Sequence, residues 1–268
     1  NDWHTLPLIP AEAFKQKKIA LFKSRAIMLM RAKMGDQPFG LKDPRIAQLL
    51  PFWKMVFDYL DVTPSYVITV RHPMSVARSL AAGKRGKIED EKSYYLWLEH
   101  VISAILETAS VKRVIVDFDL LISHPQAQLK RVAQALDLTF SAGSSGVREY
   151  ISEFLDVKLR HTQFKFEDLS IDPAVPLDAI NAYEVLVRLA HDEVDLDAPD
   201  VVELFGQLNA RLQTMRPAFN YMTYLERNVE DKDVHIGNIE SELQQLQLSN
   251  SELQLSNSEL QLSNSELQ

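Results

Sequence analysis

The 268-residue chain contains no cysteine, and this absence excludes several kinds of chemistry. Without thiols there is no disulfide, no thiolate-bound metal and no cysteine nucleophile. Histidines and carboxylates are scattered without the spacing of a ligand set, so no metal site is predicted either. A chain without disulfides suits a reducing compartment, and we expect a cytoplasmic location.

Long apolar runs are also missing. No stretch approaches the roughly 18 apolar residues of a membrane-spanning helix, so no membrane span is predicted. The first residues, Asn1-Asp2-Trp3-His4, lack the basic and apolar regions of a signal peptide. They also lack an initiator methionine, so we expect a processed chain or a part of a longer one.

Basic residues are fewer than acidic ones, so the net charge is −8. A negative net charge argues against nucleic-acid binding. Residues 42–87 are an exception, with eight basic and three acidic side chains. A basic island in an acidic protein suits a compact anionic ligand, and a solvated basic face is the alternative.

The strongest local pattern covers residues 66–80. Tyr66-Val67-Ile68-Thr69-Val70 is β-branched or aromatic, as in a buried parallel strand, and Pro73 suits the first position of a helix. Arg71 follows the strand, at the edge where open parallel sheets bind ligands. Ser75 and Ser79 share one helix face, so an anion site for phosphate is predicted; an ordinary turn with an exposed arginine is the alternative.

The remaining patterns predict an α/β protein with a parallel sheet and helices on both faces. A second strong strand is predicted at residues 111–118, and a short candidate strand at 39–42. Pro51 should kink or restart the helix that begins after Asp43, the expected cap. Residues 157–175 are irregular and polar. Helices are predicted over residues 10–34, 44–60, 88–109, 125–137, 148–156, 176–192 and 199–214.

The tail, residues 221–268, differs from the preceding domain, residues 1–220. From Leu246 the unit Leu-Gln-Leu-Ser-Asn-Ser-Glu repeats every seven residues, and an apolar seam is best supported from Ile236 onward. Leucine at heptad position d with asparagine at position a is typical of a parallel coiled coil. A coiled-coil homodimer or a connector to a fused downstream domain is expected, and a polar low-complexity linker is the alternative.

Three motifs together resemble a known family. They are Lys42-Asp43-Pro44-Arg45, Val70-Arg71-His72-Pro73 with Ser79 following, and Phe118-Asp119-Leu120-Leu121 with Pro125 after it. In order and spacing, over about residues 1 to 215, they are similar to sulfotransferases that use 3′-phosphoadenosine 5′-phosphosulfate (PAPS).

The resemblance implies a P-loop-kinase-like fold and sulfuryl transfer from PAPS to an acceptor hydroxyl, on a glycan or a small metabolite. It implies that Arg71 and Ser79 bind the 3′-phosphate and that Lys42 lies near the transferred group. A cation there would stabilise the charge that develops on the bridging oxygen.

The chain also departs from the family pattern. Phe118 stands where the family often has tyrosine, and no strand with a Gly/Ser/Thr-rich loop matches the 5′-phosphosulfate site. That loop and the general base are expected upstream of Asn1, so the chain alone is expected to be incomplete and inactive; among its own histidines, only His4 stays a candidate base. The basic loop at Lys84, Arg85 and Lys87 receives no assigned role. Two alternatives stay open: another P-loop-type kinase or transferase, and a non-catalytic coiled-coil scaffold.

Overall fold

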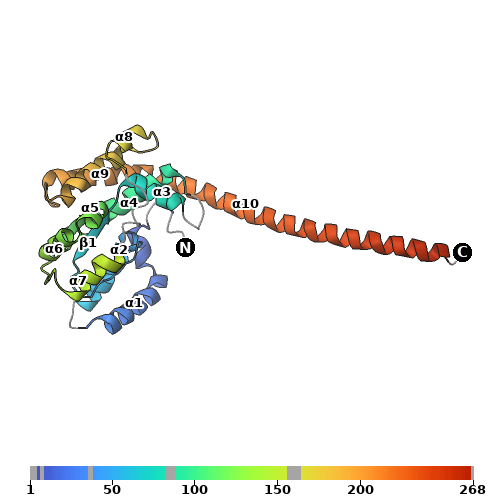
Figure 1. Cartoon of the computed structure of the whole chain (residues 1–268), viewed down its shortest axis with the longest axis horizontal. Helices are drawn as coiled ribbons and strands as arrows, with labels where there is room; N and C mark the ends of the chain where they lie inside the picture. The colour runs from blue at the N-terminus through green and yellow to red at the C-terminus, as the bar shows by residue number, and fades with distance from the viewer. Residues whose placement is uncertain (1–4, 7–8, 36–38, 83–87, 156–163, 267–268) are drawn as a thin grey trace. The chain divides into compact units, whose positions relative to one another are not determined.

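The computed structural model describes residues 5–6, 9–35, 39–82, 88–155 and 164–266 (Figure 1). The chain divides into two compact units, Asn1–Arg216 and Pro217–Gln268. Residue 220, the boundary expected from the sequence, lies just beyond this division. Among the described residues, no helix is both long enough and apolar enough to cross a membrane.

The first unit contains a two-stranded parallel sheet made of β1 (Tyr66–Val70) and β2 (Arg113–Asp117). The register pairs Tyr66 with Arg113 and Val70 with Asp117. Between the strands the chain passes through α3 (Pro73–Ala81) and α4 (Asp90–Glu107), the helical crossover that a parallel pair requires. Both strands lie within the ranges predicted from their β-branched residues.

The sheet is smaller than predicted, because the described residues hold only these two strands and 72% of the structure is helical. β1 buries Ile68 and Val70, whereas Thr69 is exposed and Val67 is 46% exposed. The described residues thus cover one face of β1, not both. The described residues form a parallel pair with helices, but they do not form a complete P-loop-like sheet.

Helix α4 lies at the centre of the first unit. It packs against α2 (Ile46–Leu60), α3 and α9 (Leu177–Ala190), while α9 and α6 (Pro125–Ala135) pack against β2. Its apolar side chains belong to the core, since Tyr94 and Leu98 are almost fully buried. The other elements are η1 (Ala11–Lys15), η2 (Lys17–Ile19), α1 (Ala20–Lys33), α5 (Phe118–Ser123), α7 (Ser145–Glu149), η3 (Tyr150–Phe154), α8 (Asp168–Ile171) and α10 (Pro199–Glu266).

Several local predictions were wrong. Residues 39–42 form no strand, and residues 11–19 form 3₁₀ turns before α1 begins. Phe118 does not extend β2 but begins α5, because the Asp117 carboxylate accepts a hydrogen bond from the Leu120 backbone N–H and caps the helix (2.9 Å). The helix predicted at residues 199–214 instead continues to Glu266 as α10.

Pro51 was predicted to kink or restart its helix, yet α2 continues from Ile46 to Leu60. A proline inside a helix has no N–H for the carbonyl four residues earlier, which here is that of Ala47. The Ser103 hydroxyl of α4 donates a hydrogen bond to that carbonyl (2.8 Å). A side chain from the neighbouring helix therefore satisfies the acceptor that the proline leaves free.

Candidate functional site

The candidate site lies at the carboxyl edge of the parallel pair. Because Val70 pairs with Asp117, the residues that follow them, Arg71 and Phe118, are neighbours at this edge. The Arg71 guanidinium carbon lies 4.8 Å from the centre of the Phe118 ring. The register of the sheet thus unites two motifs that lie far apart in the sequence.

The Arg71 guanidinium has no counterion in the described part of the chain. Its Nε is buried and has no hydrogen-bond partner, and no described carboxylate forms an ion pair with it. Its backbone is fixed, since the Trp97 indole N–H donates to the Arg71 carbonyl (3.1 Å). A cation held over a ring with free donors can accept an anionic ligand.

His72 begins α3 beside Arg71 and is 2% exposed. Its Nδ1 accepts a hydrogen bond from the Met74 backbone N–H (3.3 Å), so Nε2 carries the proton and donates to the Lys165 carbonyl (3.1 Å). Phe164 stacks on the imidazole, and Tyr183 meets it edge-on. His72 is therefore a neutral structural residue, and burial lowers its pKa.

The pKa of His72 predicts a loss of stability in mild acid. Burial lowers the pKa of His100 as well as that of His72 below the ordinary 6.5. Near and below pH 6.5 the unfolded chain therefore binds more protons than the folded one. The free energy of unfolding should fall from pH 7.5 to 5.5, by at most about 1.4 kcal/mol per pH unit for each histidine. His72→Asn, which keeps an N-cap acceptor, should reduce this fall, as measured by urea unfolding.

His124→Asn is the control, because His124 is exposed and its ring bonds only Ser123 among described residues. Asp117, whose pKa burial raises, is present in every variant and cancels from the comparison. An unchanged pH dependence in His72→Asn would contradict the assignment of a neutral imidazole.

The two serines predicted to share a helix face differ in burial: Ser75 is buried, whereas Ser79 is exposed. The Ser79 hydroxyl makes no hydrogen bond, to Arg71 or to any other side chain, in the described part of the chain. Its hydroxyl on α3 is accessible to a ligand.

Lys42 is exposed and precedes α2, and its side chain makes no hydrogen bond or ion pair among the described residues. Its neighbours are engaged with each other. The Arg45 guanidinium donates to both Asp43 oxygens (2.9 and 2.7 Å), and its backbone N–H donates to Oδ1 (2.8 Å). The Arg45 side-chain and backbone hydrogen bonds lower the pKa of Asp43 to about 2. Asp43 therefore caps the turn before α2, whose own N-cap is Arg45.

The remaining candidates from the sequence add no described group to this edge. Lys84, Arg85, Lys87 and His4 lie outside the described residues. His100 donates from Nδ1 to the Leu96 carbonyl (2.7 Å) within α4. The described residues contain no group of three or more histidines and carboxylates that could hold a metal ion.

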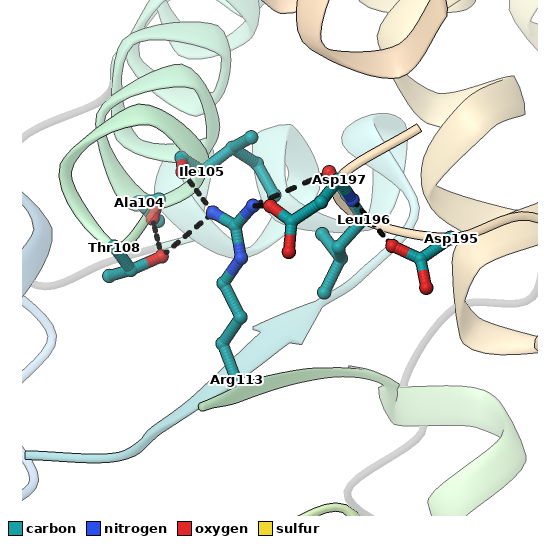
Figure 2. Close-up of polar contacts among 7 residues, drawn as sticks. All are labelled: Ala104, Ile105, Thr108, Arg113, Asp195, Leu196 and Asp197. Atoms are coloured by element: carbon teal, nitrogen blue, oxygen red, sulfur yellow. Dashed lines mark hydrogen bonds and ion pairs between the residues drawn. The ribbon is translucent and has the colours of Figure 1, made fainter. Parts of the chain in front are cut away.

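A pocket of about 290 Å³ lies at the opposite, amino edge of the sheet, where sequence reasoning predicted nothing. Arg113 and Arg131 line it, and each binds a carboxylate of the loop between α9 and α10. Figure 2 shows the Arg113 guanidinium between the end of α4 and this loop: it donates to the carbonyls of Ile105 (2.5 Å) and Leu196 (3.3 Å) and to Asp197 (2.6 Å).

Arg131 has the same arrangement, with Asp192 as its carboxylate and the Ile115 and Leu189 carbonyls as acceptors. Described groups accept hydrogen bonds from both terminal nitrogens of Arg113 and from all three guanidinium nitrogens of Arg131, while Arg113 Nε is buried without a described partner. These bonds attach the loop to the sheet. The sequence signal was an arginine inside the apolar strand Val-Lys-Arg-Val-Ile-Val, a position that requires polar partners.

Comparison of the chain with protein-family models, with curated proteins and with solved structures gives no match. Assignment of a function to this edge therefore depends on the chemistry of its residues.

Proposed function

We propose that the chain takes part in sulfuryl transfer from PAPS to the hydroxyl of an acceptor, a glycan or a small metabolite. Arg71 and Ser79 bind the 3′-phosphate, and Lys42 lies toward the transferred group. In the reaction the acceptor oxygen bonds to sulfur and gives its proton to a general base. The sulfur–oxygen bond to the 5′-phosphate breaks, and its electron pair stays on the phosphate oxygen of the leaving nucleotide. The fold is then part of a P-loop-like sheet.

One observation carries the proposal: the Arg71 guanidinium has no described anionic partner and lies at the carboxyl edge of a parallel sheet. Nucleotide phosphates bind at this edge, beside the N-terminus of the helix that follows the strand. Helix α3 begins two residues after Arg71, and the exposed Ser79 hydroxyl lies on it. A dianionic 3′-phosphate would supply the missing counterion.

Arg71→Met should weaken binding of 3′-phosphoadenosine 5′-phosphate (PAP), because it removes the charge and keeps an apolar side chain over Phe118. Loss of charge-assisted hydrogen bonds worth about 1.5–3 kcal/mol corresponds to roughly a 10- to 150-fold loss of affinity. Ligand-observed NMR titration is the suitable measurement, since contacts to one phosphate alone give weak binding.

Arg78→Met is the matched control. Arg78 lies on α3, is exposed and pairs with Asp90 (3.6 Å), so its loss should change PAP affinity by less than about threefold. Adenosine 5′-monophosphate, which lacks the 3′-phosphate, should bind the wild type and Arg71→Met equally. Unchanged PAP binding by a folded Arg71→Met variant would refute the proposal, and preference for ATP over PAP would favour a kinase.

A non-catalytic scaffold is the second candidate, favoured by the row of exposed isoleucines and leucines along α10. A folded wild-type chain that binds neither PAP nor ATP would support it.

A further inference from the structure

The second unit has an apolar stripe that no described residue covers. Within it α10 continues to Glu266 as one helix, and every described side chain from Ile236 to Ser263 is exposed. Helices in proteins gain most of their stability by packing an apolar face against another element, so this exposed segment requires a partner. Its apolar residues with exposures from 50% to 68% are Ile236, Ile239, Leu243, Leu246, Leu248, Leu253, Leu255, Leu260 and Leu262.

The leucines form two lines on opposite sides of the helix. The d line contains Leu246, Leu253 and Leu260, and the f line contains Leu248, Leu255 and Leu262. Residues two apart on a helix are separated by roughly 200° around its axis, so a single partner covers one line and not the other.

Charge selects the d line. Glu252 lies one turn before Leu255 and Glu259 one turn after it, so pairing two f lines would bring like charges together. The positions that flank the d line beyond residue 246 are glutamine and serine. They neither repel a second copy nor offer charge to attract a different partner.

The asparagines identify the partner. Asn250 and Asn257 occupy the a positions of the d-line face, after Ile236 and Leu243 in the preceding heptads. An amide both donates and accepts hydrogen bonds, so an asparagine of one helix is satisfied by the same asparagine of another. In an antiparallel pair each asparagine would face a leucine and be buried without a partner.

We propose that residues 236–266 pair with the same segment of a second copy as a parallel, in-register, two-stranded coiled coil through the a and d positions. The repeats alone permit shifts of seven residues. The heptads that contain Ile236, Ile239 and Leu243 fix the register, because a shift places asparagine against isoleucine or leucine. This inference does not depend on sulfuryl transfer.

Sedimentation equilibrium of the full chain should give twice the chain mass. Leu253→Glu with Leu260→Glu on the d line should shift it to the monomer mass. Leu255→Glu with Leu262→Glu, the same changes in the same heptads on the f line, should leave the dimer intact. A monomeric wild type, a trimer or dissociation by the f-line pair would overturn the proposal.

Orientation is tested separately, and this test does not require a destabilised helix. Since the chain has no cysteine, Leu260→Cys introduces a single thiol. In a parallel, in-register pair the two thiols meet and form an intermolecular disulfide on mild oxidation, whereas those of Leu255→Cys, on the outer face, should not. Equal cross-linking of the two variants, or none by Leu260→Cys, would refute the arrangement.

Discussion

Tyr183→Ala is expected to lower the free energy of unfolding of the first unit by about 3–5 kcal/mol, as for other large buried aromatic residues. Tyr183 is 7% exposed and joins several rings beneath the candidate site. Its ring centre lies 4.9 Å from that of His72, 6.2 Å from that of Trp97 and 6.3 Å from that of Phe166. Alanine would leave a cavity among side chains that cannot all move to fill it.

Tryptophan fluorescence is the suitable readout for this variant, because the tail beyond Arg216 contains no tryptophan. The melting temperature should fall by roughly 6–20 °C, at about 2–4 °C per kcal/mol for a domain of this size. Tyr59→Ala is the control: Tyr59 is 58% exposed, and the cations of Lys23 and Arg31 lie over its ring. A loss in Tyr183→Ala no larger than in Tyr59→Ala would contradict the packing described.

Arg113→Met is expected to cost about 2–4 kcal/mol, even though its carboxylate partner is largely solvated. The Asp197 side chain is 65% exposed and would regain water. The cost arises instead at the carbonyls of Ile105 and Leu196, which lose a charged donor, and in the loop between α9 and α10, which loses its attachment.

Lys112→Met, one residue earlier, is the matched control. Lys112 also pairs with an aspartate, Asp137, but both side chains are more than half exposed. Exposed pairs contribute about 0–1 kcal/mol, so this variant should stay within that range in urea unfolding. Equal losses in the two variants would show that the Arg113 hydrogen bonds to the two carbonyls do not stabilise the fold.

The parts of the structure that depend on local composition could be predicted from the sequence. The β-branched runs predicted both strands, and the helices between them predicted that the pair is parallel. That Arg71 lies against Phe118 was not predicted, because Phe118 was assigned to the strand itself. The heptads from Ile236 indicated a long helix. Each of these inferences uses residues close together in the chain or one rule of sheet geometry.

Parts that depend on distant contacts could not be predicted. Arg113 binds Asp197 across 84 residues, and His72 reaches the carbonyl of Lys165 across 93. No periodicity in the sequence marks such pairs. The start of α5 depends on the hydrogen bond from the Leu120 backbone N–H to the Asp117 carboxylate, which residue order alone does not predict. The roles of Arg71, Ser79 and Lys42 follow from chemical analogy and stay predictions until ligand binding is measured.

The hydroxyl of Ser103 has a consequence for how the sequence of this protein can change. With serine at position 103, position 51 accepts proline or any residue with an N–H, because the Ala47 carbonyl has a donor in either case. Without that hydroxyl, proline at position 51 leaves an acceptor unpaired inside the helix. Ser103 is thus a permissive residue. If serine arises at position 103 before proline arises at position 51, the Ala47 carbonyl has a hydrogen-bond donor at every step. If proline arises first, the intermediate protein has an unpaired carbonyl.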